Sequence, residues 1–179
     1  MLEPIKSYMQ KKALRELRDV QRKTRIENIK DINTICVVCQ LAEEPEWNVI
    51  AHFNKVMTSK GKTVSTIAIQ DKDIDFVVAD PQVCICHSKT DLNYWGIPKE
   101  EVISQAVGRR YDLLIDTLGA DRFFAQYIAL RTQASLKAVY STGDAEPTDI
   151  YDLIIRGDSP LELKGYFNHV IEYLAMINK

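Results

Sequence analysis

Apolar runs alternate with amphipathic segments along most of the chain. Residues 34–40 form a β-branched run without polar alternation, which is typical of a strand buried on both faces. Apolar side chains then recur at helical spacing between Pro45, which suits a first helical turn, and Gly61, which suits a helix end. Residues 63–70 form a second apolar run. This order predicts two parallel strands joined through one helix.

The same alternation continues to the end of the chain. Four more strands are predicted, at residues 83–87, 111–118, 136–142 and 149–156. Helices are predicted over residues 4–27, from Pro98, over 120–132 and from Ser159, where Ser159-Pro160-Leu161-Glu162 has capping-box spacing. The expected fold class is α/β: a three-layer sandwich with a mostly parallel sheet of about five or six strands, Rossmann-like or flavodoxin-like, preceded by a long N-terminal helix.

Composition divides this chain into two unequal parts. The 179 residues are 46% hydrophobic, which suits one continuous core, and we expect residues 31–179 to be a single α/β domain. Residues 1–30 hold nine Lys and Arg against four Asp and Glu, so this basic helical arm carries +5 and the remainder −7. The sequence has neither a membrane-span pattern nor a signal-peptide pattern at its start, and a cytoplasmic location is therefore expected.

The predicted sheet also locates a candidate binding site. Ligands of open parallel sheets bind beyond the carboxyl ends of the strands, where the crossovers diverge. Polar residues at or just after the predicted strand ends therefore define a candidate ligand crevice, made of Gln40, His87, Asp116, Thr117, Ser141 and Arg156.

Several cofactor and catalytic patterns are missing at these strand ends. The turn after the first strand, LAEEPE, lacks the glycines of a dinucleotide site or P-loop, so no cofactor is expected. Residues 111–119 resemble the acceptor strand of receiver domains, but Cys39 and Gln40 stand where magnesium-binding acids are needed. Asp116 is therefore expected to be a turn-stabilising acid that marks the site, and no catalytic residue is assigned.

Metal sites are not predicted either. Cys36 and Cys39 lie on opposite faces of one strand, whereas zinc requires convergent ligands. The acidic segment after residue 70 begins with calcium-loop spacing, but Phe76 occupies the position that requires glycine. We therefore expect the cysteines to be core residues and the acidic segment to be solvated.

The basic arm suggests two kinds of partner. RNA or ribosome association is one possibility, because a cationic helix face neutralises phosphates. The acidic remainder and the lack of interleaved aromatic residues favour the other, in which the arm docks on its own domain or on a second copy of the chain and produces a homo-oligomer. The candidate polyanion contacts are Lys11, Lys12, Arg15, Arg18 and Arg22.

Together with the predicted first strand at residues 34–40, three further sequence features resemble a family of uncharacterised bacterial proteins. They are Lys-Gly-Lys-Thr at residues 60–63, the loop from Asp91 to Pro98, and the strand from Tyr111 to Asp116. In this family a basic N-terminal helix precedes a small α/β domain. The resemblance implies a Rossmann-like fold over the full chain and no established activity.

The sequence supports three hypotheses for the function. The first is a non-catalytic interaction or small-ligand-binding domain. The second is a transferase-like enzyme that binds an anionic or sugar ligand at the strand ends, with Asp116, His87 and Arg156 as polar contacts. The third is RNA or ribosome association through the basic arm.

Overall fold

Six parallel strands form one sheet at the centre of the molecule. The computed structural model describes residues 3–18, 23–142, 149–157 and 162–177. The strands are β1 (Thr34–Gln40), β2 (Thr63–Gln70), β3 (Val83–His87), β4 (Arg110–Asp116), β5 (Gln133–Thr142) and β6 (Leu153–Gly157). All neighbouring pairs are parallel, and their order across the sheet is β3-β2-β1-β4-β5-β6. The α/β prediction is confirmed, with six strands.

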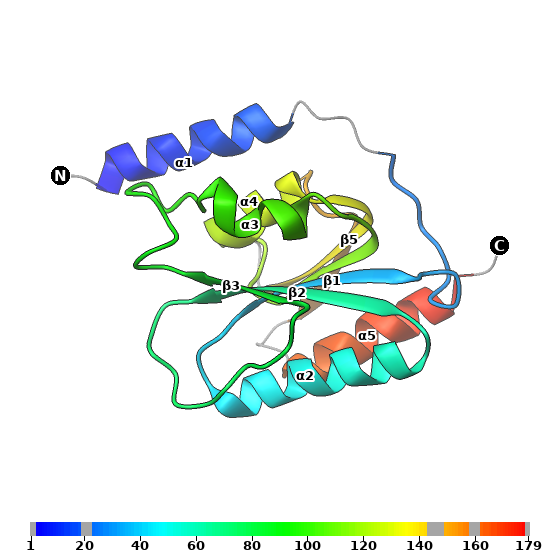
Figure 1. Cartoon of the computed structure of the whole chain (residues 1–179). Helices are drawn as coiled ribbons and strands as arrows, with labels where there is room; N and C mark the ends of the chain where they lie inside the picture. Colours follow the sequence, from blue (N-terminus) through cyan, green and yellow to red (C-terminus); the bar gives the residue numbers. More distant parts are fainter. Residues whose placement is uncertain (1–2, 19–22, 143–148, 158–161, 178–179) are drawn as a thin grey trace.

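Helices cover both faces of this sheet. One face carries α2 (Glu44–Ser59) and α5 (Leu163–Ala175), and the other carries α3 (Glu100–Val107) and α4 (Phe123–Arg131) (Figure 1). The N-terminal helix α1 (Glu3–Arg18) lies outside α4, so it adds a layer to the three-layer sandwich (Figure 1). No described helix is long and apolar enough to cross a bilayer.

The strand order reverses next to β1. From β1 the chain moves outward to β2 and β3, then returns through α3 to place β4 on the other side of β1. It continues outward to β5 and β6. The connections that leave β1 and β4 therefore diverge, because α2 follows β1 on one face and α4 follows β4 on the opposite face. This reversal is the position at which parallel sheets bind ligands.

Strand parity divides the core into two layers. Val37 and Cys39 face α2 and α5, whereas Cys36 and Val38 face α3 and α4. All four side chains are fully buried, which is the result of covering both faces of a parallel sheet. The first layer is reinforced where the rings of Phe53 and Phe167 stack with centroids 4.1 Å apart. Thus the two helices on this face hold each other as well as the sheet.

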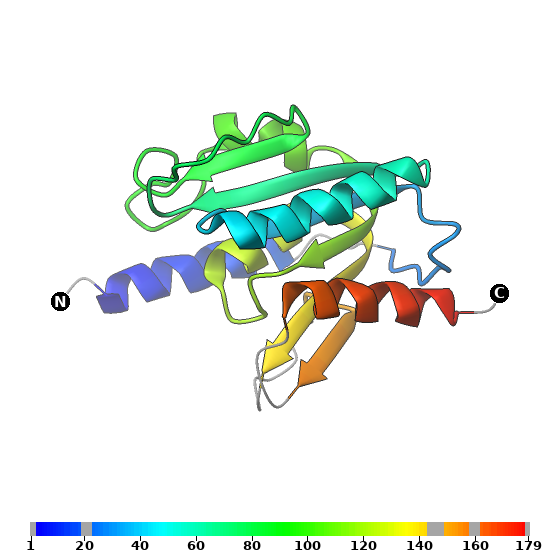
Figure 2. The ribbon, with the colours of Figure 1, turned by 90° about the horizontal axis from the view of Figure 1, so that it is seen from below.

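Figure 2 shows α2 and α5 from below the sheet, with their N-termini toward the same end of the molecule. That end is also where the strands finish, as required when each helix follows a parallel strand. The first turns of both helices consequently lie beside the carboxyl edge of the sheet.

Several predicted boundaries differ from the structure, among them the starts of β5 and α4, each of which is shifted by three residues. Three other differences concern the arm, the last helix and β6. The helix expected over residues 4–27 ends at Arg18, and the later part of the arm instead bonds to the domain: Arg25 N–H donates to the Ser135 carbonyl at 3.0 Å. The last helix has Glu162 as its N-cap, while Ser159 to Leu161 lie outside the described residues. Strand β6 begins at Leu153 instead of residue 149, and Tyr151, which precedes it, is buried in the layer that contains α4.

The turn after β4 depends on one glycine and one carboxylate. Gly119 has φ +107°, a conformation that side-chain-bearing residues rarely adopt, so a glycine is needed there. The turn is also held by Asp116, whose carboxylate accepts a 2.7 Å hydrogen bond from the Leu118 N–H. The expected role of Asp116 as a turn-stabilising acid is therefore confirmed.

Candidate functional site

A cleft of about 560 Å³ lies at the carboxyl edge of the sheet where the strand order reverses. Its walls come from the ends of β1, β4 and β5 and from the first turns of α2 and α5. We call it the carboxyl-edge cleft. Its polar lining consists of Gln40, Glu46, Thr117, Arg122, Tyr140, Glu162, Lys164 and Tyr166. Apolar side chains between these groups make the cleft amphipathic, as is usual for small-molecule sites.

Two of the six predicted crevice residues line this cleft directly. The Gln40 side-chain amide donates to the Asp71 carboxylate at 3.0 Å, which orients it at the end of β1. The Thr117 hydroxyl donates to the Val38 carbonyl at 3.0 Å, and the Thr117 N–H donates to the same carbonyl at 2.9 Å. Both side chains are thus held in place by the sheet that carries them.

Asp116 ends β4 directly before Thr117 and is completely buried. Besides its bond from Leu118, its carboxylate accepts a 2.5 Å hydrogen bond from the Tyr151 hydroxyl. Burial raises the pKa of Asp116 to about 7, and the bonds from Tyr151 and the turn backbone oppose this rise. The carboxyl group therefore changes charge near neutral pH, but it does not line the cleft.

The other three predicted residues are not brought to the cleft. Ser141 is buried near the end of β5 and is paired in register with Arg156 of β6. His87 ends β3 at one edge of the sheet and Arg156 lies on β6 at the other edge. With four strands between them, these two edges are roughly 24 Å apart at the usual strand spacing. Asp116, His87 and Arg156 therefore do not converge on one pocket.

The sequence does not predict six of the eight polar lining residues, and Tyr166 is the buried one among those six. It belongs to the first turn of α5, forms part of the cleft wall, and is 2% exposed. Its hydroxyl group is buried and has no hydrogen-bond partner among the described residues. Burial, followed by the nearby Asp116 charge, raises the pKa of Tyr166 well above its usual value, so it stays protonated. In the sequence, Tyr166 has only the spacing of a core residue.

The surroundings of the cleft are acidic on the β2 side. A neighbouring depression of about 490 Å³ shares Gln40 and is lined by Glu43, Asp71, Asp73 and Asp75. Asp73 and Asp75 are exposed, as expected for a solvated segment. Among the described residues, no group of three or more His, Cys, Asp or Glu is arranged to hold a metal ion.

The cysteines are core residues by position and by chemistry. Cys36 and Cys39 face opposite layers of the core, which confirms the strand-parity prediction. Burial is the largest effect on both thiols; it raises the pKa of Cys39 to about 12 and that of Cys36 further. Neither side chain forms the reactive thiolate near neutral pH.

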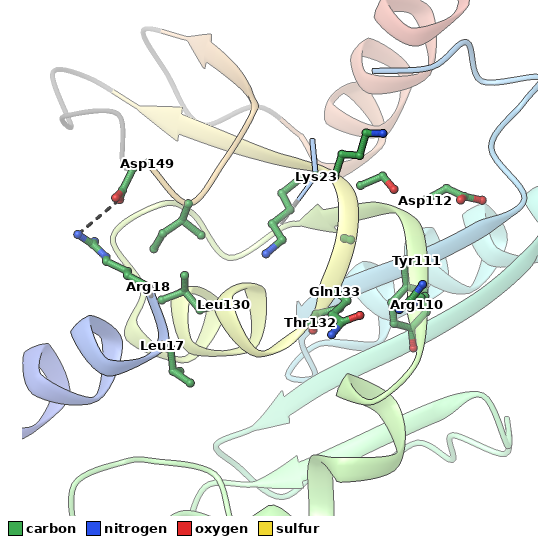
Figure 3. Close-up of a pocket in the computed structure, with 14 residues that line it drawn as sticks. Leu17, Arg18, Lys23, Arg110, Tyr111, Asp112, Leu130, Thr132, Gln133 and Asp149 are labelled. Carbon is green, nitrogen blue, oxygen red and sulfur yellow. Dashed lines mark ion pairs between the residues drawn. The ribbon is translucent and has the colours of Figure 1, made fainter. Parts of the chain in front are cut away.

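The opposite edge of the sheet contains a larger cavity, of about 600 Å³ (Figure 3). This cavity lies at the starts of β4 and β5 and against the arm. Its lining includes Arg18 and Lys23 of the arm and Arg110 and Asp112 of β4. Figure 3 shows the ion pair between Arg18 and Asp149, whose atoms are 3.4 Å apart. Lining residues Asp149 and Ser135 also bond to Arg18 and Arg25 of the arm, so the cavity lies where the arm meets the domain.

Helix α1 turns its basic residues outward. Its half-buried side chains, which include Met9, Leu14 and Leu17, follow one face, and the Gln10 amide donates to the Trp95 carbonyl at 2.8 Å. The cations of the candidate polyanion set are exposed at positions Lys11, Lys12, Arg15 and Arg18, whereas Arg22 lies outside the described residues. Docking of α1 on its own domain thus leaves a cationic face in solvent.

The strand order and the position of the cleft define a Rossmann-like α/β protein. The chain belongs to DUF6913, a family of unknown function, which it matches over residues 6–177. This match covers the arm and the domain together, in agreement with the full-length family resemblance seen in the sequence. No curated protein and no solved structure matches the chain.

The buried Asp116 generates a pH-dependent prediction. Because its pKa is about 7 in the folded protein and near 4 when unfolded, the stability that Asp116 contributes falls as pH rises from about 4 to about 7. Asp116→Asn removes this titration. Urea titrations give the free energy of unfolding of both proteins. The difference between them, variant minus wild type, should therefore become more positive by roughly 2–3 kcal/mol between pH 5 and pH 8. Asp73→Asn, in the exposed loop, is the matched control, and an Asp116→Asn difference that does not change with pH would contradict the assignment.

Proposed function

We propose that this domain binds a small polar molecule in the carboxyl-edge cleft. The observation that carries the proposal is the coincidence of the cleft with the strand-order reversal between β1 and β4. Diverging connections leave room there for a ligand, and the cleft volume of about 560 Å³ lies within the range of small-molecule sites.

The geometry favours binding over turnover. Asp116 is the carboxyl group whose pKa lies near neutrality, yet it is enclosed between Tyr151 and the turn and does not reach the cleft surface. His87, the histidine among the predicted crevice residues, ends the β3 edge strand. A transferase that uses Asp116, His87 and Arg156 together is therefore disfavoured, because general acid–base chemistry needs groups within hydrogen-bond reach of one substrate.

Obstruction of the cleft tests this proposal. A thermal-shift panel of sugars, nucleosides, nucleotides, nucleotide sugars and amino acids should contain a compound that raises the melting temperature of the wild type saturably. Thr117→Phe fills the cleft between β1 and α5, and we expect the shift from that compound to fall by at least half. The variant itself should lose about 1 kcal/mol of stability with the Thr117 hydrogen bond to Val38.

Thr90→Phe is the matched control for Thr117→Phe. Thr90 is an exposed threonine that also makes a side-chain hydrogen bond, to Asp91 at 3.0 Å, but it lies in the loop after β3. The rise in melting temperature that the ligand produces in Thr90→Phe should equal the rise in the wild type. Equal shifts in both phenylalanine variants would place binding elsewhere on the protein, and the absence of any shift over the panel would count against a small-ligand role.

A second candidate function is association of α1 with RNA. The observation in its favour is that docking of α1 leaves Lys11, Lys12 and Arg15 exposed on its outer face. One of these cations, Lys12, has Glu16 at 4.0 Å, a separation at which solvent-exposed charges interact weakly. The three side chains therefore remain accessible to phosphates.

Replacement of these cations tests the second candidate. In fluorescence-anisotropy titrations with single-stranded RNA, the triple substitution of Lys11, Lys12 and Arg15 by Gln should weaken binding and lower the salt slope by about two. The matched control replaces the exposed Lys55, Lys60 and Lys72 by Gln, with the same change in net charge. If the control loses as much affinity as the α1 variant, the interaction is general and the helix has no specific role.

A further inference from the structure

We propose that the ligand of the carboxyl-edge cleft is a neutral polyhydroxylated compound, of the sugar or nucleoside class, and that the Tyr166 hydroxyl is its buried hydrogen-bond partner. This inference rests on the proposed function and specifies its chemistry. It depends on three independent features of the cleft: an unpaired polar group, the balance of charge, and the nature of the remaining side chains.

The unpaired group is the Tyr166 hydroxyl. A buried hydroxyl without a partner is costly, and such groups are uncommon in folded proteins. Tyr166 cannot relieve the cost by moving freely, because its ring packs against Tyr140 and Phe167 at centroid distances of 5.9 and 6.1 Å. Nearby Asp116 is already bonded to Tyr151 and to the turn backbone. Tyr166 lines the cleft, so a ligand that displaces the atoms now covering its hydroxyl would supply the missing partner.

The charge of the cleft opposes a phosphorylated ligand. Glu46 and Glu162 are balanced by Arg122 and Lys164, so the charged side chains of the lining sum to zero. The first turn of α2 adds a second exposed acid at Glu44, at the helix end where a phosphate would otherwise be favoured. Further carboxylates line the adjoining depression. An anionic ligand would therefore be repelled, whereas a neutral one would not.

The remaining polar groups suit hydroxyls. Carboxylates accept strong hydrogen bonds, the Gln40 amide can donate and accept, and the Thr117 hydroxyl, whose proton goes to Val38, can accept. Apolar side chains at Val49, Ile50 and Leu118 border these groups and offer contact area for ring carbons. This mixture fits a compact ring with several hydroxyl groups better than it fits a purely apolar or purely ionic compound.

The test compares two conservative variants on the same helix. Tyr166→Phe removes only the unpaired hydroxyl, so we expect the variant to fold with an unchanged or higher melting temperature. Tyr173→Phe makes the same change at an exposed position of α5 outside the cleft. Binding is measured by isothermal titration calorimetry with glucose, galactose, adenosine and uridine, and with glucose 6-phosphate, AMP and UMP.

We expect at least one neutral probe to bind the wild type more tightly than its phosphorylated counterpart. Tyr166→Phe should weaken that binding by about three- to tenfold, the contribution of one hydrogen bond, and Tyr173→Phe should leave it unchanged. Tighter binding of the phosphates, or equal affinity of Tyr166→Phe and wild type, overturns the inference and leaves the proposed function intact. If no probe binds, the inference also fails, and the wider thermal-shift panel then decides the proposed function separately.

Discussion

The parallel direction of all six strands is the constraint on which the rest of this molecule depends. It sends every carboxyl end to one edge of the sheet, and it places the first turns of α2 and α5 beside that edge. Because the strand order reverses between β1 and β4, the chain leaves these neighbours in opposite directions. The carboxyl-edge cleft is the space between those connections, so its position follows from topology before any side chain is considered.

Asp116 stabilises the rim of this cleft at an electrostatic cost. Its carboxylate ties the turn after β4 to Tyr151, which precedes β6, and thereby joins the central strand to the edge of the sheet. Complete burial makes the ionised form unfavourable, as the raised pKa indicates. Such a group would not be needed merely to fill the core, where an apolar residue packs without this penalty. It holds polar loops in a fixed arrangement next to the cleft.

The sequence predicts the sheet well because strand burial leaves a local pattern. Residues 34–40 show it as a run rich in β-branched residues without polar alternation, and residues 63–70 show it as a second apolar run. The order of the strands across the sheet leaves no local pattern in the sequence. The predicted crevice therefore includes both His87 and Arg156, although these two residues lie on opposite edge strands of the sheet. Tyr166 could not be predicted either, because the lack of a hydrogen-bond partner for its hydroxyl is a property of the folded structure and not of the local sequence.

The most direct test of the central claim is to map binding on the backbone by NMR. Amide chemical shifts of the ¹⁵N-labelled full chain would be followed during titration with the neutral sugars and nucleosides used for calorimetry. We expect saturable changes at Gln40, Thr117 and Tyr166 and in the first turn of α2, where the cleft lies. Changes confined to the opposite edge around Arg110, or no saturable change at the carboxyl edge with any probe, would contradict the claim.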